Sequence, residues 1–376
     1  MTSFVYRKLI ALTSVAIIVG LCLTGQQASA ESGRLTVQQA DAQPPTVTYV
    51  NCGGGIQQVL YTPAVGFNPL TATDTELVAN GLPIRPTSAA DLSVWRKAMT
   101  HPINTRTRTC GLQSVSASAA TTLPATTLPA TELPATPAVN TTATTPNWSG
   151  YKITGHTYED AYGYWTLPNV GAPPPPFAAL STQWVGIGQG SKASLPLVQA
   201  GTQSSINEGC ECDQYYMWWE VVPEFGHQHV IDLGIVILFG NVMYAHIHVS
   251  NNNAYITLAD VTDSDASATF KYVLPKGTSI KPDGTAEWIN ERPTTILHDF
   301  FPLASGSITF TSAEVSGIRL SKRGVGSSSL SHTDINMWTC TKPKVQMARP
   351  LGFAKNGTQF TIKWLRYGHT DPTNCK

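Results

Sequence analysis

From Asn147 onward, the sequence alternates between short runs typical of β-strands and short clusters of turn residues. The runs show period-two alternation or are rich in β-branched and aromatic residues, and turn clusters such as 251–253 (NNN) and 282–284 (PDG) separate them. Examples are Ala161–Leu167, Thr182–Ile187, Tyr215–Val222, Val230–Leu238, Val242–Val249, Ala254–Val261 and Gln359–Leu365. Many short strands at regular spacing predict an all-β fold, namely an antiparallel sandwich or jelly roll.

Charged residues are scarce and balanced in sign. The chain of 376 residues has 24 Lys+Arg against 24 Asp+Glu, and charged residues make up 13% of it. A globular domain usually has about 25% charged residues, and a nucleic-acid-binding domain usually has a basic excess. The composition therefore argues against a nucleic-acid partner, while a hydrophobic share of 42% is sufficient for a sizeable core.

The first 30 residues have the pattern of a secretory signal peptide. Arg7 and Lys8 form a positive segment, residues 9–24 form an apolar segment, and residues 28–30 (ASA) match a cleavage site. The apolar run is shorter than the roughly 20 residues that a membrane-spanning helix needs. We therefore expect a secreted, extracellular protein with no membrane segment in its mature form.

Cysteine usage agrees with secretion. Loss of the signal peptide removes one cysteine of seven, and an even number in a secreted chain indicates disulfides. The remaining cysteines are Cys52, Cys110, Cys210, Cys212, Cys340 and Cys375. We expect the first two to pair, because both precede the spacer described next, and the last two to pair around a terminal hairpin. The pairing of Cys210 and Cys212 stays open.

A spacer divides the chain. Residues 121–136 have the sequence TTLPATTLPATELPAT, a five-residue unit repeated three times, and Thr-rich sequence continues to residue 145. Such a segment is extended and packs poorly. We therefore expect a pro-region at 31–120, a linker at 121–145 and the main domain at 146–376.

The pro-region should contain two short helices. Thr73 and Glu76 form a capping box, and the apolar residues of 91–99 follow helical spacing. Basic residues outnumber acidic ones between positions 85 and 108. This basic stretch is either a solvated face or a cover for an acidic cleft in the main domain, and in the second case the precursor would be a zymogen.

Two His-x-His pairs, at 227–229 and 246–248, each place two imidazoles on one face of a strand. Such a pair is either half of a metal site or a polar patch on the wetter face of a sheet. The sequence has no P-loop, no H-E-x-x-H and no G-x-S-x-G motif. We therefore expect neither a metal nor a cofactor.

Three polar residues interrupt otherwise apolar or aromatic strand runs. Gln199 lies in 195–201 (LPLVQAG), Glu220 in 216–223 (YMWWEVVP) and Glu287 in 286–289 (AEWI). A carboxylate in apolar surroundings costs free energy unless it is paired or functional. Each residue alone could be a solvent-facing strand residue, but three together favour a functional site.

At these positions the chain resembles the eqolisin family of glutamic peptidases, from Asn147 to near Tyr367. The matching segments, in order, are 147–151 (NWSGY), 163–168 (GYWTLP), 184–187 (WVGI), 198–201 (VQAG), 218–220 (WWE), Pro223, 286–289 (AEWI) and 306–311 (GSITFT). The resemblance implies an antiparallel β-sandwich of two seven-stranded sheets with a concanavalin-like jelly-roll topology. It also implies a peptidase, with Gln199 and Glu287 as the catalytic dyad.

From the same resemblance we expect Trp184, Glu220 and Gly201 to bind substrate. The substrates would be proteins or peptides, and the enzyme would act as a monomer. Three positions depart from the family pattern: Gly188 and Gln203 stand where Asp is common, and Ala200 replaces the usual Thr. These departures leave the dyad intact. The charge of the cleft and the preferred substrates, however, are not carried over from the family to this chain.

The dyad also makes chemical sense from its parts. An ionised Glu287 can take a proton from water and return it to the leaving amine. An unperturbed Glu pKa of roughly 4.3 would suit a base that works in acid. The Gln199 amide can donate to the oxyanion, and such a donor is worth on the order of 10²–10³ in rate. The sequence therefore predicts an acid-active endopeptidase.

Two other functions fit parts of the sequence. A glycoside hydrolase on the same sandwich would use Glu220 and Glu287, with carboxyl groups about 5–5.5 Å or 6.5–9.5 Å apart, but it would give Gln199 no role. A lectin-like module would stack exposed aromatic residues on sugars and would hydrolyse nothing.

Overall fold

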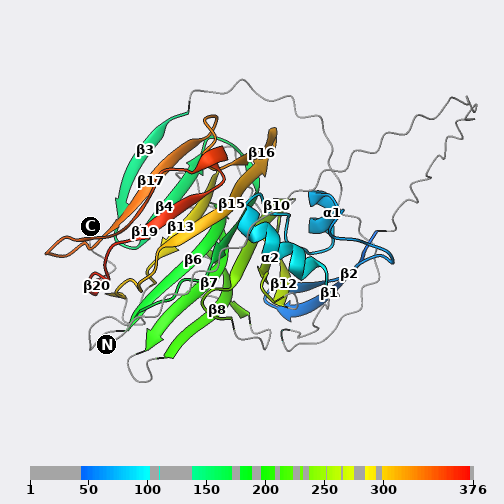
Figure 1. Ribbon diagram of the computed structural model, residues 1–376, viewed down its shortest axis with the longest axis horizontal. Helices are drawn as coiled ribbons and strands as arrows, with labels where there is room; N and C mark the ends of the chain where they lie inside the picture. Colours follow the sequence, from blue (N-terminus) through cyan, green and yellow to red (C-terminus); the bar gives the residue numbers. More distant parts are fainter. Residues whose placement is uncertain are drawn as a thin grey trace, which may run out of the picture. The chain divides into compact units, whose positions relative to one another are not determined.

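The computed structural model (Figure 1) describes residues 44–101, 110, 138–171, 178–188, 196–207, 212–222, 229–231, 237–250, 252–263, 266–274, 284–293 and 299–372. All of them belong to one unit of the chain, Ala42–Lys376. The predicted signal peptide and residues 111–137 of the pro-region and linker lie outside these ranges. Within the described ranges, no helix has the length and apolar character needed to cross a membrane.

One layer of the fold, here the first layer, contains the residues of the predicted dyad. Its strands are β4 (Trp148–Thr154), β6 (Ala179–Gly188), β7 (Leu197–Asn207), β8 (Cys212–Val222), β9 (His229–Ile231), β13 (Thr285–Glu291) and β17 (Ser331–Trp338). They pair antiparallel in the order β9, β8, β7, β6, β13, β4, β17. Strand β3 (Asn140–Thr145) pairs in parallel with β17, so the Thr-rich end of the predicted linker forms a strand, in line with the β-propensity of Thr.

The second layer is also antiparallel. Its strands are β5 (Tyr158–Thr166), β10 (Val242–Ser250), β11 (Asn253–Asp260), β12 (Ala266–Val273), β15 (Ile308–Gly317), β16 (Leu320–Gly324), β18 (Gln346–Pro350) and β19 (Phe360–Trp364). Their order is β12, β11, β10, β5, β15, β19, β18, with β16 on β15. Pairing of β17 with β18 joins the two layers into one hydrogen-bonded network.

Three short elements complete the main domain. They are β14 (Asp299–Phe300), β20 (Asp371–Pro372) and a 3₁₀ turn at Lys355–Gly357. The two strands pair with each other. Beside them, Arg292 and Asp371 form an ion pair between fully buried side chains, so this ion pair ties the end of β13 to the C-terminal segment.

Apolar side chains that alternate along the strands of both layers form the core between the layers. Trp288 on β13 is buried there, and its Nε1 donates to the carbonyl oxygen of Tyr162 on β5 at 3.1 Å. Trp165 on β5 donates from Nε1 to Thr202 Oγ1 on β7 at 3.0 Å. These two indole hydrogen bonds connect the layers while the rings remain buried. The residues that alternate with the core residues face outward from each layer.

The predicted antiparallel β-sandwich is confirmed, and most predicted strands are present with boundaries shifted by a few residues. The predicted run Val230–Leu238 is the clearest difference. Only His229–Ile231 is a described strand, and Leu238 lies outside any strand with an exposed side chain. The predicted strand therefore does not include its last two residues, and residues 232–236 lie outside the described ranges.

The N-terminal unit, residues 44–110, contains both predicted helices and one hairpin that we did not predict. The helices are α1 (Asp74–Ala79) and α2 (Ala89–Met99). The predicted capping box at α1 is confirmed, because Thr73 and Glu76 exchange hydrogen bonds between side chain and backbone. The hairpin consists of β1 (Thr46–Gly53) and β2 (Ile56–Thr62). Its signal in the sequence was the alternation of polar and apolar residues over 46–50, followed by three glycines.

This unit packs against the second layer rather than standing apart from it. Strand β2 pairs with β12, so the hairpin extends the sheet of the second layer (Figure 1). The helices cover the outward-facing residues Tyr162, Tyr164 and Tyr244 of β5 and β10. The Tyr164 hydroxyl donates to the carbonyl oxygen of Ile84, and Lys322 forms an ion pair with Asp74 at 2.6 Å. The N-terminal unit is therefore part of the folded body of the protein.

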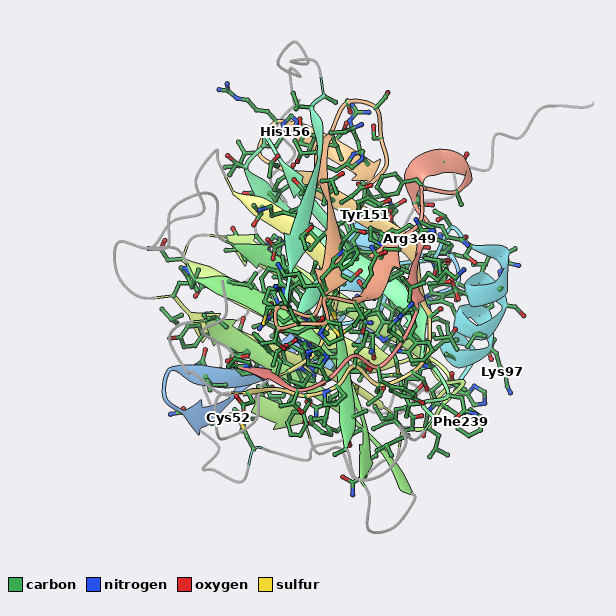
Figure 2. All side chains as sticks on the ribbon, turned by 90° about the vertical axis from the view of Figure 1, so that its left-hand side faces the viewer. Cys52, Lys97, Tyr151, His156, Phe239 and Arg349 are labelled. Atoms are coloured by element: carbon green, nitrogen blue, oxygen red, sulfur yellow. A yellow bond between two sulfur atoms is a disulfide. The ribbon has the colours of Figure 1, made fainter. Side chains whose placement is uncertain are left out.

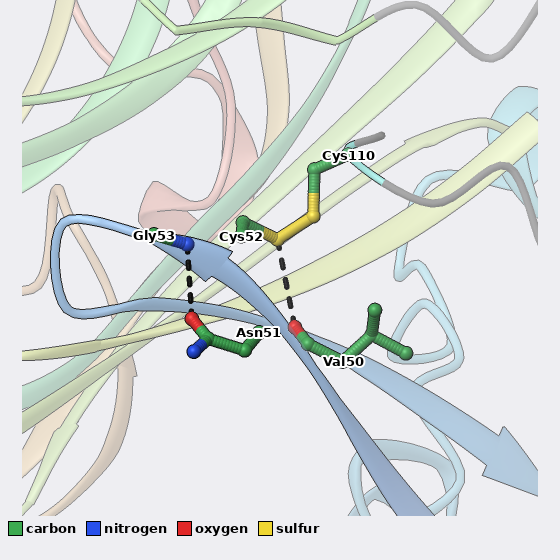
Figure 3. Close-up of a disulfide and its surroundings, with 5 residues drawn as sticks. All are labelled: Val50, Asn51, Cys52, Gly53 and Cys110. Atoms are coloured by element: carbon green, nitrogen blue, oxygen red, sulfur yellow. Dashed lines mark hydrogen bonds between the residues drawn. A yellow bond between two sulfur atoms is a disulfide. The ribbon is translucent and has the colours of Figure 1, made fainter. Parts of the chain in front are cut away.

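The predicted disulfide between Cys52 and Cys110 is confirmed (Figure 3), with Cα atoms 5.4 Å apart. It closes the N-terminal unit on itself and makes no link to the main domain. Cys340 is disulfide-bonded as predicted, while its expected partner Cys375 lies outside the described residues. Cys210 also lies outside them, so its pairing with Cys212 stays open.

Candidate active site

Five residues on adjacent strands of the first layer lie in one register, and we call them the central row. Glu220 on β8 is opposite Gln199 on β7, which is opposite Gly186 on β6. Gly186 is also opposite Glu287 on β13, which is opposite Lys152 on β4. Side chains of directly opposite residues lie on the same face of a sheet. The two predicted dyad residues therefore share the outer face of the first layer.

Only one strand separates Gln199 from Glu287. Neighbouring strands are about 4.8 Å apart, so the two backbones are roughly 9–10 Å apart. The residue between them is Gly186, and a Cβ there would approach Leu197 Cδ1 and Trp184 Cζ3 to 3.0 Å. A larger residue would be crowded there, and glycine places no side chain between Gln199 and Glu287.

Both dyad side chains are buried yet incompletely hydrogen-bonded. Gln199 is 5% exposed and Glu287 is 4% exposed. Among the described residues, neither Gln199 Oε1 nor Glu287 Oε2 has a hydrogen-bond partner. Leaving a buried polar atom without a partner costs about 1–3 kcal/mol. Two such atoms beside the same glycine mark a place where the protein keeps hydrogen-bonding capacity for another molecule.

Burial changes the protonation of Glu287. It raises the pKa of Glu287 to about 7, against the opposing effects of the Lys152 charge and a hydrogen bond with Thr285. The Glu291 carboxylate adds a smaller increase. The expected unperturbed pKa is therefore wrong for this structure, because the sequence showed an apolar neighbourhood but not how completely it encloses the carboxyl group.

Glu220 contacts Gln199 directly. Gln199 Nε2 donates to Glu220 Oε2 at 3.2 Å. A carboxylate accepts hydrogen bonds but cannot donate them, so this contact keeps the NH₂ end of the amide on the Glu220 side. One Nε2 proton is used in this way, and the other is available for a second acceptor. The residue that we expected to bind substrate thus holds the amide in one orientation.

Trp184 and Gly201 lie opposite each other two register positions along β6 and β7 from Gly186 and Gln199, on the same outer face. Trp184 is fully buried, and its ring meets Trp148 edge-on with centroids 5.1 Å apart. A Cβ at Gly201 would lie 1.9 Å from the Gln183 carbonyl oxygen, so only glycine fits here. The structure therefore gives both predicted substrate-binding residues a packing role beneath the surface.

Glu291 is a half-buried carboxyl group that our sequence reasoning missed. It lies four residues after Glu287 on the same strand face, which was the signal available in the sequence. Burial raises its pKa to about 7. Glu287 Oε2 has no partner among the described residues, whereas both oxygens of Glu291 accept a hydrogen bond, from Trp184 Nε1 at 2.8 Å and from Asn147 Nδ2 at 3.1 Å. The arrangement fits a structural carboxyl group better than a reactive one.

The three departures from the family pattern have different settings. A Cβ at Gly188 would lie 2.5 Å from Leu197 Cα, so this backbone has no room for the Asp of the pattern. Ala200 points into the core between the layers, away from the dyad. Gln203 is buried opposite Thr182 and Tyr216. None of the three adds charge beside the central row.

The histidine pair at 246–248 forms a polar cluster on the second layer. His246 Nε2 and His248 Nδ1 both contact Asp160 Oδ1, at 2.8 and 2.9 Å. These contacts hold the pKa of Asp160 well below its usual range in spite of burial. Among the residues that the structure describes, no group of three or more His, Cys, Asp or Glu could hold a metal ion. His227 and the side chain of His229 lie outside the described residues.

The N-terminal unit lies on the side of the sandwich opposite the central row. Glu287 faces outward from the first layer, whereas the next residue, Trp288, points inward to β5. The helices pack on the outer face of β5 and β10, beyond both layers. The hypothesis that the basic stretch covers the site is therefore wrong for its described part.

The basic residues themselves have other environments. Arg85 donates to the carbonyl oxygens of Leu70 and Ala72 at 2.9 and 3.0 Å, within its own unit. Arg96 and Lys97 are exposed, and Figure 2 shows Lys97 pointing away from the strands. Arg106 and Arg108 lie outside the described residues.

One family model matches more than half of the chain. The sequence model of the peptidase A4 family matches residues 146–347. Scytalido-glutamic peptidase, solved with a transition state analog inhibitor, shares 18% identity with a TM-score of 0.47, over 58% of this chain and 98% of that one. Aspergilloglutamic peptidase from Aspergillus niger shares 20% identity with a TM-score of 0.38, over 50% and 99%. No curated protein matches the chain.

Proposed function

This chain belongs to the peptidase A4 family and is a glutamic peptidase, and we propose that Gln199 and Glu287 are its catalytic dyad. One observation carries the proposal. Two buried polar side chains flank Gly186 on one sheet face, and each keeps an oxygen atom without a partner among the described residues. A denatured protein substrate should be cut to peptides by the wild type and left intact by Glu287→Gln.

The chemistry follows from the two side chains. Ionised Glu287 takes a proton from a water molecule, whose oxygen attacks the carbonyl carbon of the peptide bond. The carbonyl oxygen becomes negatively charged and accepts a hydrogen bond from Gln199 Nε2, through the proton that does not bind Glu220. Glu287 then gives its proton to the amide nitrogen as the C–N bond breaks. An amide does not titrate, so Gln199 remains a donor at every pH at which the protein is folded.

The raised pKa of Glu287 leads to an expected pH dependence. A general base must be ionised, and the pH dependence of kcat/KM reports the pKa of that base in the free enzyme. Since burial raises the pKa of Glu287 to about 7, kcat/KM should rise about tenfold per pH unit below that value and level off above it. Initial rates on a fluorogenic peptide from pH 3 to 9 measure this.

The pH optimum of kcat/KM should therefore lie nearer neutrality than the optimum of an enzyme whose general base is an unperturbed carboxyl group. A flat profile from pH 3 to 7 would contradict an ionised Glu287 as the base. Because only the pKa of Glu287 is involved, the measurement does not depend on which peptide is chosen, provided that the peptide itself does not titrate in this range.

Glu220 should support the dyad without being essential. Glu220→Gln keeps the size of the side chain but weakens its hold on the Gln199 amide, and one hydrogen bond contributes about 1 kcal/mol. We expect a loss of up to roughly tenfold in kcat. A loss as large as that of Glu287→Gln would instead favour a glycoside hydrolase mechanism.

The strand order argues against a glycoside hydrolase mechanism. Glu220 and Glu287 lie three strand spacings apart, roughly 14 Å between backbones, and Gln199 lies between them. Carboxyl pairs in glycoside hydrolases are about 5–9.5 Å apart, so here the two side chains would have to reach toward each other across Gln199, whose amide contacts Glu220. The lectin-like alternative needs exposed aromatic rings, but Trp184 and Trp218 on this face are buried.

Secretion and processing extend this proposal. The sequence of residues 1–30 supports export, after which the folded enzyme would act outside the cell as a monomer. The Thr/Pro repeat of the linker, residues 121–136, would be the cleavage target, because such a sequence packs poorly. The extensive contacts of residues 44–101 with the second layer support a unit that stays bound after such cleavage.

A further inference from the structure

Lys152 occupies the end of the central row next to Glu287. It is directly opposite Glu287 in the pairing of β4 with β13. Cβ atoms of such opposite residues are about 4.5–5.5 Å apart, on the same face of the sheet. Lys152 is half-buried whereas Glu287 is buried. A cationic side chain therefore lies beside the carboxyl group, on the side away from Gln199.

The other neighbours of Glu287 cannot supply a positive charge. Its partner on β6 is Gly186, and the next strand contributes the neutral Gln199. The carboxyl groups on this face are Glu291, four residues along β13, and Glu220 at the far end of the row. Among the described residues that face Glu287 on these strands, Lys152 is the single cation.

We propose that Lys152 is a positioning residue for catalysis: its ammonium group stabilises the ionised form of Glu287, the form that takes a proton from the attacking water. Burial favours the neutral carboxylic acid, which cannot act as a base. The carboxylate of Glu291 acts in the same direction as burial. A nearby cation offsets these effects, and the pKa of Glu287 is indeed lowered by Lys152 relative to burial alone.

The size of the effect can be bounded. An opposite charge within about 4–6 Å lowers the pKa of a carboxyl group by roughly 1–3 units. Lys152 is partly solvated, and solvent screening reduces the interaction. We therefore expect a shift at the lower end, about one unit. On the acid limb of the profile, at a pH well below the pKa of Glu287, a shift of one pKa unit changes kcat/KM roughly tenfold.

Three variants test the proposal, which rests on the proposed peptidase function. Lys152→Met removes the charge and keeps most of the side-chain length, whereas Lys152→Arg keeps the charge. Lys363→Met removes an exposed lysine from β19 in the second layer and controls for net charge. The measurement is kcat/KM on a neutral peptide from pH 4 to 9 for each variant and the wild type.

We expect Lys152→Met to move the acid limb up by about one pH unit while the plateau at high pH is kept. Lys152→Arg and Lys363→Met should follow the wild-type profile. A Lys152→Met profile that overlays the wild type would overturn the proposal. So would a loss of activity that is equal at every pH, because that is the result of a purely structural role.

A second readout separates this proposal from the proposed function. The Glu287 carboxyl can be titrated by carbon-13 NMR in the full-length protein, using Glu287→Gln to assign its signal. Lys152→Met should raise the titration midpoint by about one unit even if no peptide is ever cleaved. An inactive wild type would refute the peptidase dyad, whereas an unshifted midpoint would refute the role of Lys152.

Discussion

Glu287→Gln is expected to lower kcat for peptide hydrolysis by roughly 10³-fold or more while the melting temperature stays nearly unchanged. A positioned acid–base group contributes about 10²–10⁴ in rate, and a glutamine cannot take a proton from water. Glutamine has the same shape, and the oxygen that it replaces, Glu287 Oε2, has no partner among the described residues. No hydrogen bond is therefore lost at that atom. Initial rates and thermal melts on the same samples measure both quantities.

Gln199→Ala should give the companion result. Losing one oxyanion donor costs on the order of 10²–10³ in kcat. The Glu220 carboxylate also loses the hydrogen bond that it accepts from Gln199 Nε2. Because Glu220 is only half-buried, water can replace that donor and the melting temperature should fall little. Full activity in this variant would remove Gln199 from the mechanism.

Glu291→Gln is the matched control for Glu287→Gln. Both residues lie on the same face of β13 and burial raises the pKa of both to about 7. Glu291, however, accepts hydrogen bonds from Trp184 and Asn147, so its replacement should lower the melting temperature and keep turnover within about tenfold per folded molecule. The two variants should thus show opposite patterns. Equal losses of turnover would mean that burial, and not position, explains the effect.

Removal of residues 31–110 is expected to prevent the main domain from folding stably. It would expose the rings of Tyr162, Tyr164 and Tyr244 and open the edge of β12. Burying one large side chain contributes about 2 kcal/mol, and a domain is stable by only about 5–15 kcal/mol. An open sheet edge also favours aggregation. Soluble yield and thermal melts of the truncated and full-length chains measure the effect.

A cut in the linker provides the control for truncation. A specific protease site placed between residues 111 and 137 leaves every described contact intact, and the Cys52–Cys110 disulfide holds no bond across the cut. The two fragments should co-elute in size-exclusion chromatography and separate only in denaturant. An N-terminal fragment that elutes alone, beside a main domain that stays folded and active, would contradict the role that we assign to this unit.

The alternation of polar and apolar residues along the predicted strands pointed to the candidate site. Gln199, Glu220 and Glu287 interrupted apolar strands, and the family motifs pointed to the same positions. Alternation places a residue on one face of its strand but does not say which strands are neighbours. The direct register of Gln199, Gly186 and Glu287 depends on the order β7, β6, β13, in which β13 is distant in sequence. That order comes from tertiary packing, which a single sequence does not display.

Burial explains the other differences between expectation and structure. Trp184 was expected to bind substrate, which stays a prediction; in the structure its buried indole donates a hydrogen bond to the half-buried Glu291. The pKa of Glu287 was expected to be ordinary, but enclosure by the sheet face raises it. One of the two hypotheses for the basic stretch placed it over the dyad, but the tyrosines of β5 and β10 hold the helices on the opposite face. In each case, the deciding contact joins segments that are far apart in the chain.

A double-mutant cycle tests the dyad most directly. The kcat of the wild type, Gln199→Ala, Glu287→Gln and the double variant would be measured on one peptide at pH 8, where the Glu287 of the wild type is ionised. Residues that act as a unit show non-additive losses, so the double variant should be about as slow as the slower single variant. If the two losses instead multiply, or if Glu287→Gln alone remains fully active, Gln199 and Glu287 do not form the catalytic dyad.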